Sequence, residues 1–314
     1  MRVFVLLNQS ARTAKGSDQE ECARKVEDAF AKRGAVAVIK TVHGSEITGA
    51  VQDYLQRQAC DPSTGYDVLV VGGGDGTIGA ASGVLIGNSE PFGILALGTL
   101  NHFAKDLSIP LELEAAVEVI LQGKSRLIDA GELNGRIFIN NSSVGLYPFM
   151  VASRIAEQNR RGFGKLVASI PAIARTLFKG TWHRFYIRFE NRKLSFRTPC
   201  IFVGNNMYDL GLERFGSRSR LDLGELSVFV INLQTKLALL LLPFRVALGI
   251  TNRSRDIEVF KTDAVEVASR LRRLRVSLDG EVKMIETPLR YSIKRRALCV
   301  LAPVEDNRIN EAEN

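Results

Sequence analysis

One glycine-rich stretch of the chain has the composition of a phosphate-binding loop. An apolar run over residues 68–71 leads into Gly72-Gly73-Gly74-Asp75-Gly76-Thr77, and a helix can follow from Ile78 onward. Glycine permits left-handed backbone angles and lets backbone N–H groups approach a ligand closely, and a helix N-terminus adds positive partial charge. We therefore predict a phosphate cradle at Gly72–Thr77 and the start of the following helix. The alternative is a tight turn that needs glycine only for its backbone shape.

Two better-known phosphate loops are excluded by the residues around this one. A P-loop needs Lys followed by Ser or Thr after its last glycine, and no such pair follows here. The spacing Gly74-x-Gly76-x-x-Gly79 matches the dinucleotide fingerprint. The next apolar stretch, however, ends in Ala96-Leu97-Gly98, without the acid that would hold the ribose. We therefore exclude a dinucleotide-dependent oxidoreductase.

Asp75 is unexpected inside such a cradle, because a carboxylate repels phosphate groups. Its presence is explained if a Mg²⁺ ion lies between the carboxylate and the phosphates, or if Asp75 handles a proton or a hydroxyl group. Either explanation points to nucleotide-dependent phosphoryl transfer, in which positioning and charge neutralisation do most of the work.

A second polar loop, Gly98–Leu107, follows the next apolar stretch. Thr99 and Asn101 supply short polar groups there, whereas a single histidine such as His102 is more often packed or capping than catalytic. Loops that follow neighbouring parallel strands lie at one edge of the sheet, where open α/β sheets bind their ligands. We therefore expect the two loops to lie side by side.

The elements that must position these loops alternate between strand and helix in the first part of the chain. Short, nearly all-apolar strands between helices are typical of a parallel sheet covered on both faces. We expect strands at residues 2–8, 36–42, 66–71 and 91–97, and helices at residues 18–33, 46–58, 78–86 and 113–121.

From about residue 129 the pattern changes, because strand-like segments now follow one another. We expect strands at residues 136–140, 184–190, 194–203, 226–231, 257–261, 264–268 and 276–278, with helical stretches at 147–179 and 236–250. The predicted organisation is an α/β nucleotide-binding domain over residues 1–128, a mostly β domain with inserted helices over residues 129–304, and a polar tail over residues 305–314.

Composition limits the class of protein. The chain has 314 residues, of which 46% are hydrophobic and 24% charged, so it is not disordered, fibrous or a coiled coil. It has no signal-peptide pattern at its start, no apolar run long enough for a membrane span, and four scattered cysteines, so we expect free thiols in the cytoplasm. The net charge of +8 favours anionic partners such as phosphates or acidic lipids, and no nucleic-acid-binding motif is present.

Together the two loops resemble the diacylglycerol kinase catalytic family, whose bacterial lipid kinases carry a GGGDGT loop followed by a GTxNDFAR-like loop. Here these read Gly72–Thr77 and Gly98–Lys105. The resemblance extends to Asp129–Gly135, to Ile139–Gly145 and to the late Asp-Gly-Glu element at Leu278–Glu281. The GGDG motif alone is shared with NAD kinases and phosphofructokinases. The pattern GTLNHFA indicates a subgroup whose lipid substrate need not be diacylglycerol.

The resemblance implies a fold and a set of residue roles. The fold is a Rossmann-like α/β nucleotide domain plus a C-terminal β-sandwich-like domain, with ATP and Mg²⁺ in the cleft between them. Gly72–Ile78 would hold the ATP phosphates, and Asp75 would also contact Mg²⁺. Further contacts in the nucleotide and metal network would come from Asn8, Thr41, Thr99, Asn101 and Asp129, and Lys165 matches a basic residue of the family.

The family resemblance also makes Glu281 the general base, with Asp279 assisting. These carboxylates are two residues apart, so on a strand they would share a face. Like charges then raise one carboxyl pKa towards the range that is useful for proton abstraction. The alternative is that Asp279-Gly280 is simply a β-turn between two strands.

Three positions depart from the family pattern. The opening NPxxG motif is replaced by residues 8–12, Asn-Gln-Ser-Ala-Arg, without its proline and glycine. His102 stands where the family's second loop has an acid. Leu223, beside Asp222, stands where the family's structural Mg²⁺ site has its acid, so a ligand of that site is missing.

The function expected from these observations is ATP-dependent phosphorylation of a hydroxyl of diacylglycerol or a related lipid, by a cytoplasmic protein that works at the inner membrane surface. The basic stretch 147–179 and the apolar stretch 236–250 are candidate membrane contacts. One alternative is an NAD kinase-like phosphotransferase. Another is a nucleotide-binding regulatory protein without catalysis, which the departures at His102 and Leu223 favour. We predict no nucleic-acid partner, and the sequence leaves the oligomeric state open.

Overall fold

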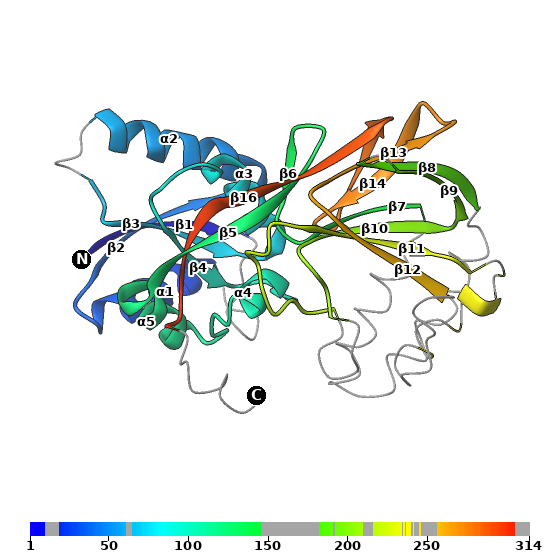
Figure 1. Cartoon of the computed structure of the whole chain (residues 1–314). Coiled ribbons are helices and arrows are strands. Elements are labelled where there is room, and N and C mark those ends of the chain that lie inside the picture. Colours follow the sequence, from blue (N-terminus) through cyan, green and yellow to red (C-terminus); the bar gives the residue numbers. More distant parts are fainter. Residues whose placement is uncertain are drawn as a thin grey trace. The chain divides into compact units, whose positions relative to one another are not determined.

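The computed structural model describes two compact units (Figure 1). The described residues are 1–9, 19–60, 65–145, 182–190, 192–209, 216–233 and 256–304, together with 235, 237–239, 241 and 245. The first unit comprises Met1–Ile128 and Arg296–Asn314, and the second comprises Asp129–Arg295. The expected second domain ran to residue 304, whereas the chain returns to the first unit at Arg296.

The first unit is an α/β sheet whose central strands are parallel and buried. Its strand order is β2-β1-β3-β4, and the last part of β16 pairs with β4 in parallel. Figure 1 shows helices α2 and α3 on one face of this sheet and α1 and α5 on the other. The strands are β1 (Arg2–Asn8), β2 (Val36–Val42), β3 (Val68–Gly73) and β4 (Phe92–Ala96), and the helices are α1 (Gln19–Ala31), η1 (Gly44–Glu46), α2 (Ile47–Cys60), α3 (Asp75–Leu85), α4 (His102–Asp106) and α5 (Leu113–Gln122).

The second unit consists of antiparallel strands in two sheets that share one apolar core. One sheet has the order β12-β11-β10-β7-β14-β15, and the other contains β16, β13, β8 and β9 in that order. Buried side chains of both sheets, such as Ile187 and Val228, belong to the same cluster. The strands are β6 (Arg136–Phe138), β7 (Asn141–Gly145), β8 (His183–Phe189), β9 (Arg192–Thr198), β10 (Cys200–Asn205), β11 (Leu226–Ile231), β12 (Ile257–Thr262), β13 (Ala264–Ser269), β14 (Arg273–Leu278) and β15 (Glu281–Glu286).

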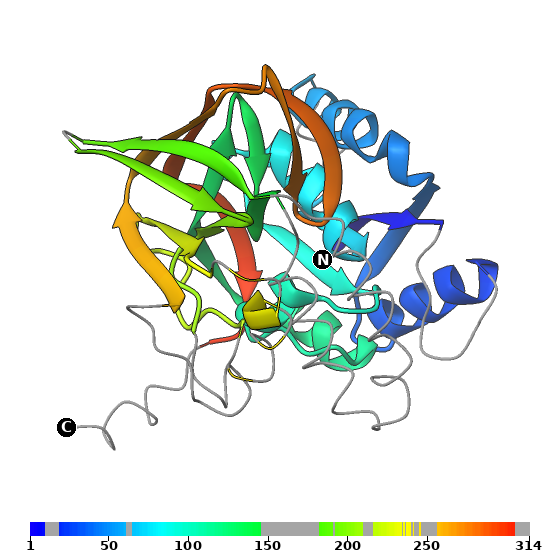
Figure 2. The same ribbon diagram turned by 90° about the vertical axis from the view of Figure 1, so that its right-hand side faces the viewer.

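Two long strands, β5 (Lys124–Leu133) and β16 (Leu289–Ala302), each contain a boundary between the units. The predicted class, an α/β N-terminal domain followed by an antiparallel β domain, is confirmed. The blue helices α1 and α2 of the first unit can also be followed in the turned view (Figure 2).

One predicted strand is wrong. Residues 194–203 form two strands, β9 and β10, which lie in different sheets and are separated by Pro199. Proline cannot donate a ladder hydrogen bond, so it ends one strand and the chain crosses to the other sheet.

The stretch 147–179 lies outside the described residues, as does most of 236–250. Among the helices of the described residues, none is long and apolar enough to cross a lipid bilayer.

Candidate functional site

The carboxyl ends of the parallel strands bring several predicted site residues to one edge of the first unit. β1 ends at Asn8, β2 ends just after Thr41, and β3 ends at Gly73. The Nδ2 group of Asn8 donates a hydrogen bond to Oγ1 of Thr77 at 2.6 Å. The end of the first strand is therefore tied directly to the glycine loop.

The glycines of this loop are required by close packing and not by left-handed backbone angles. Gly74 has φ −90° and ψ 179°, which any residue can adopt. A Cβ on Gly73 would lie 2.6 Å from Cβ of Thr77, and a Cβ on Gly98 would lie 2.5 Å from Cα of Gly74. The two predicted loops thus touch backbone to backbone, and only glycine permits this approach.

Helix α3 begins directly at the end of this loop. Gly74 is its N-cap, and the first hydrogen bond of the helix runs from the N–H of Ile78 to the carbonyl of Gly74 at 3.1 Å. The N–H groups of Asp75, Gly76 and Thr77 come before that bond, so helix geometry gives them no acceptor inside the helix. They and the helix dipole suit an anionic ligand. Ile78 itself was expected to contact phosphate, but its N–H is bound to Gly74 and its side chain is buried.

Asp75 joins the two loops. Its Oδ2 accepts a hydrogen bond from the N–H of His102 at 3.2 Å, and its Oδ1 accepts one from the N–H of Phe103 at 3.1 Å. The carboxylate therefore caps the start of α4 from the neighbouring loop. This bridge gives the acid in the predicted phosphate cradle a structural role even without a ligand.

Asn101 shapes the second loop from inside. Its backbone is left-handed, with φ 51°, and its side chain is buried. Its Oδ1 accepts from the N–H of Gly98 at 3.0 Å, and its Nδ2 donates to the carbonyls of Ala96 and Gly98. These bonds occupy the side-chain amide, whereas the neighbouring Thr99 is exposed.

In the second unit, Asp279 lies in the tight turn of the β14–β15 hairpin. Leu278 pairs with Glu281, so Asp279 and Gly280 form the two-residue loop, with φ 47° and 91°. Positive φ at both positions is the pattern of a type I′ hairpin turn. The expectation that Asp279 and Glu281 share one face of a strand is therefore wrong, and the alternative of an Asp-Gly turn is confirmed.

The Asp279 carboxylate faces the backbone of residues 139–141, a segment that we call the strap. It accepts hydrogen bonds from the N–H groups of Ile139 (2.8 Å), Asn140 (2.8 Å) and Asn141 (3.0 Å). Burial raises the pKa of Asp279 to about 6, against the opposing effect of these three amides and of Arg218. The predicted pKa rise is thus present on Asp279, but its cause is loss of water and not repulsion from Glu281.

Glu281 has a different environment from its neighbour in the sequence. It is the first residue of β15, and its side chain is 61% exposed. One carboxylate oxygen lies 3.0 Å from Nζ of Lys283. Glu281 is therefore accessible to a substrate, whereas the carboxylate of Asp279 is committed to the backbone.

A buried arginine that sequence reasoning missed holds the same strap. Arg218 is 3% exposed, and its Nη1 donates to the carbonyls of Ile139 (2.7 Å) and Asn205 (3.0 Å). Its Nη2 donates to Oδ1 of Asn140 at 2.7 Å, and its guanidinium lies over the ring of Tyr208. The surrounding Gly-Ser-Arg-Ser-Arg stretch looks like ordinary surface loop, so nothing in the sequence indicated a buried cation.

Residues 2–133 match the family model of the diacylglycerol kinase catalytic domain. Among curated proteins, the diacylglycerol kinases of Staphylococcus aureus strains bovine RF122 / ET3-1 and MRSA252 are each 31% identical to this chain over 131 residues. That alignment covers 41% of this chain and 41% of either relative, so the match spans about two fifths of their length. The match over residues 2–133 agrees with the family resemblance of the two loops, and the GTLNHFA subgroup stays a prediction.

Solved structures extend the likeness in fold to nearly the whole chain. A structure described as a diacylglycerol kinase from Bacillus anthracis str. Sterne superposes with a TM-score of 0.67 at 17% identity, covering 96% of both chains. A second structure from that organism gives a TM-score of 0.71 at 19% identity, covering 96% of this chain and 97% of the other. At these identities the likeness establishes the fold.

Asp129 falls within the matched residues 2–133, and it is held by backbone groups and by a side-chain amide. It is fully buried in the second unit, and its Oδ2 accepts from the N–H of Gly224 at 2.6 Å. Its backbone N–H donates to Leu221, and its carbonyl accepts from Nδ2 of Asn205. The carboxylate thus binds the backbone at Gly224 and is not exposed to a ligand.

The expected Mg²⁺ ion would need several oxygen ligands from the protein or the substrate. Among the described residues, no group of three His, Cys, Asp or Glu side chains is placed to hold a metal. Both oxygens of Asp75 already accept backbone N–H groups, and Asp222, beside Leu223, is paired with Arg220. The described donors therefore do not fit a protein-built metal site. Lys165 lies outside the described residues.

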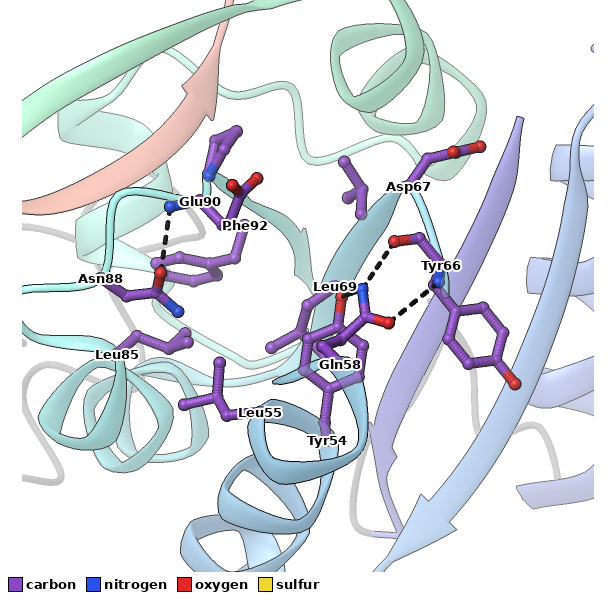
Figure 3. Close-up of a pocket in the computed structure, with 12 residues that line it drawn as sticks. Tyr54, Leu55, Gln58, Tyr66, Asp67, Leu69, Leu85, Asn88, Glu90 and Phe92 are labelled. Atoms are coloured by element: carbon purple, nitrogen blue, oxygen red, sulfur yellow. Dashed lines mark hydrogen bonds between the residues drawn. The ribbon is translucent and has the colours of Figure 1, made fainter. Parts of the chain in front are cut away.

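A small cavity lies at the opposite edge of the sheet in the matched segment (Figure 3). Its volume is about 80 Å³, and its lining includes Val68 and Phe92, the first residues of β3 and β4. The glycine loop follows the other end of β3, so this cavity is not the predicted phosphate cradle. Its polar wall is ordered by the Gln58 amide, which bonds to both backbone groups of Tyr66.

Proposed function

We propose that this chain transfers the γ-phosphate of ATP to a hydroxyl group of diacylglycerol or a related lipid. The observation that carries the proposal is the N-terminus of α3, where the close-packed glycine loop leaves first-turn N–H groups for phosphate and Asp75 holds the second loop beside them. The match of residues 2–133 to the diacylglycerol kinase catalytic domain supports a phosphotransferase.

In this mechanism the first-turn N–H groups of α3 bind the phosphates of ATP and stabilise their negative charge. We assign Glu281 as the general base, because its carboxylate is exposed and not committed to the backbone. Glu281 accepts the hydroxyl proton of the lipid while the lipid oxygen attacks the γ-phosphorus. The bond from the γ-phosphorus to the bridging oxygen breaks, and ADP leaves. Asp279 acts as a positioning residue, since it fixes the backbone strap next to β7.

The test is transfer of label from γ-labelled ATP, with MgCl₂ present, to a total lipid extract in mixed micelles. Labelled lipid is the expected product, and its mobility identifies the acceptor. Glu281→Gln should lower kcat by roughly 100-fold or more, as expected for loss of a general base. The matched control is Glu286→Gln at the other end of β15, where the side chain is also exposed. Equal lipid phosphorylation by both variants would remove Glu281 from the mechanism.

NAD is assayed in parallel as an acceptor, because the GGDG motif is shared with NAD kinases. Labelled NAD with unlabelled lipid would replace the proposal by the NAD kinase-like alternative. Binding of ATP without transfer to either acceptor would favour the regulatory alternative.

A further inference from the structure

The outer face of the sheet formed by β8, β9 and β13 is unusually basic. The register of β8 with β9 pairs Arg184 with Arg197, Tyr186 with Ser195, and Arg188 with Lys193. Alternate residues of a strand point to opposite faces, and the intervening Phe185, Ile187 and Phe189 of β8 are buried in the core. The six paired side chains therefore share the solvent face of the sheet (β8, β9 and β13 in Figure 1).

Two of these pairs place like charges directly opposite each other, at Arg184–Arg197 and at Arg188–Lys193. Such cross-strand pairs reduce the stability of a sheet. The next strand, β13, contributes one acid, Glu266, which accepts from Arg188 at 2.9 Å.

The same acid also accepts from Arg290 of β16, at 3.1 Å. On these four strands the face thus combines five basic side chains with one acidic side chain that is already paired. We call this surface the basic sheet face; it consists of Arg184, Tyr186, Arg188, Lys193, Ser195, Arg197, Glu266 and Arg290.

An aromatic side chain stands in the middle of this surface. Tyr186 is 41% exposed, on the strand that carries Arg184 and Arg188. Tyrosine has an apolar ring and a polar end, which suits the boundary between water and lipid. Adjacent strands lie about 4.8 Å apart, so the charges form a closely spaced, flat array.

We propose that the basic sheet face binds the anionic headgroups of a membrane surface. The choice of a membrane over another polyanion rests on the proposed function, because a lipid kinase must meet its substrate there. It also rests on the aromatic content, since single-stranded nucleic acid is bound on a series of exposed aromatic side chains and this face has only Tyr186. A polyanionic surface relieves the repulsion between the like charges in the Arg184–Arg197 and Arg188–Lys193 pairs. Binding to such a surface therefore accounts for the presence of pairs that reduce the stability of the sheet.

The test is sedimentation of the full chain with vesicles of phosphatidylcholine alone or with about 30 mol% phosphatidylglycerol, an anionic lipid. The variant Arg184→Gln/Arg197→Gln should lose at least roughly tenfold in affinity for the anionic vesicles. The control Arg24→Gln/Lys25→Gln removes the same charge from exposed positions of α1 and should change binding less than twofold. Added salt should weaken wild-type binding, because the attraction is between exposed charges. An unchanged or higher thermal midpoint of the Arg184/Arg197 variant shows that it is folded.

Equal loss of vesicle binding in both variants would overturn the proposal, since only net charge would then matter. Loss of binding to a single-stranded RNA oligonucleotide, with vesicle binding intact, would overturn it in favour of nucleic acid. Activity on a water-soluble short-chain diacylglycerol separates membrane binding by the basic sheet face from lipid kinase activity. If the variant loses vesicle binding but retains that activity, both stand. If no diacylglycerol is phosphorylated and vesicle binding is still lost, the surface assignment stands and the proposed function fails.

Discussion

At the scale of single residues, Asp75 has a structural role, because it holds the second loop against the glycine loop. Each of its carboxylate oxygens accepts a backbone N–H of the second loop. In Asp75→Asn one oxygen becomes an NH₂ group, which cannot accept, so one bond is lost and two donors face each other. We expect a loss of about 1–3 kcal/mol in the free energy of unfolding, and a KM for ATP that rises more than kcat falls.

The measurements are urea denaturation and initial rates over a range of ATP concentrations. Asp53→Asn, on the exposed side of α2, is the matched control and should change neither. A large fall in kcat with unchanged stability and unchanged KM would instead assign Asp75 to the chemical step.

Asp279 predicts a pH dependence of stability. Its pKa is raised by burial to about 6 in the folded chain, above the ordinary value of 3.8. Between these values the folded state holds a proton that the unfolded state has released, so stability falls as pH rises from about 4 to 6. The contribution of Asp279 is fully present below pH 4 and is lost as pH passes 6. Its total is on the order of 1–3 kcal/mol.

Asp279→Asn removes this titration and should therefore destabilise the protein more at pH 4 than at pH 7. Urea denaturation of both proteins at several pH values measures the difference. A difference in unfolding free energy that stays constant over this range would show that Asp279 titrates normally.

At the scale of elements, the contact between the two loops depends on Gly98. A Cβ at this position would lie 2.5 Å from Cα of Gly74, which is backbone and cannot move aside cheaply. Gly98→Ala should therefore separate the loops, lower stability by about 1–3 kcal/mol and raise the KM for ATP. Gly83→Ala in α3 is the control, because nothing lies within 4 Å of its Cβ and alanine favours helix. Relative to wild type, the thermal midpoint should fall in Gly98→Ala and rise in Gly83→Ala. The KM for ATP, measured by ATP titration, should rise only in Gly98→Ala.

The elements of the first unit could be predicted because their periodicity is local. The all-apolar β3 and β4 and the helical spacing of α1 and α5 are each visible in a short window of sequence. Strand β15 could not be found in this way, since Glu281–Met284 are all exposed and its position is fixed by pairing with β14. The candidate site, too, could be predicted only where its signal is local in the sequence. The glycine loop is a local signal, whereas Arg218 and the strap at residues 139–141 meet only through long-range folding.

At the scale of the whole molecule, β16 is one continuous strand that serves two units. Residues 289–295 belong to the second unit and residues 296–302 to the first. In the first unit Ala297 accepts from the N–H of Gly87 at 2.7 Å, and Leu298 is fully buried. The matched segment 2–133 therefore lacks a strand that completes its own sheet. We expect the two units to unfold in one transition, because disrupting β16 in one disrupts its pairing in the other.

Leu298→Ala tests this coupling, since it should cost about 2–5 kcal/mol within the first unit. Trp182 is the only tryptophan of the chain and donates from Nε1 to the carbonyl of Leu233, so its fluorescence reports the second unit. In urea, the midpoint from Trp182 fluorescence should fall together with the midpoint from far-UV circular dichroism. Leu237→Ala, at a side chain that is 66% exposed, should leave both midpoints in place. Two separate transitions, with the Trp182 midpoint unmoved by Leu298→Ala, would mean that the strand passes between units that are stable independently.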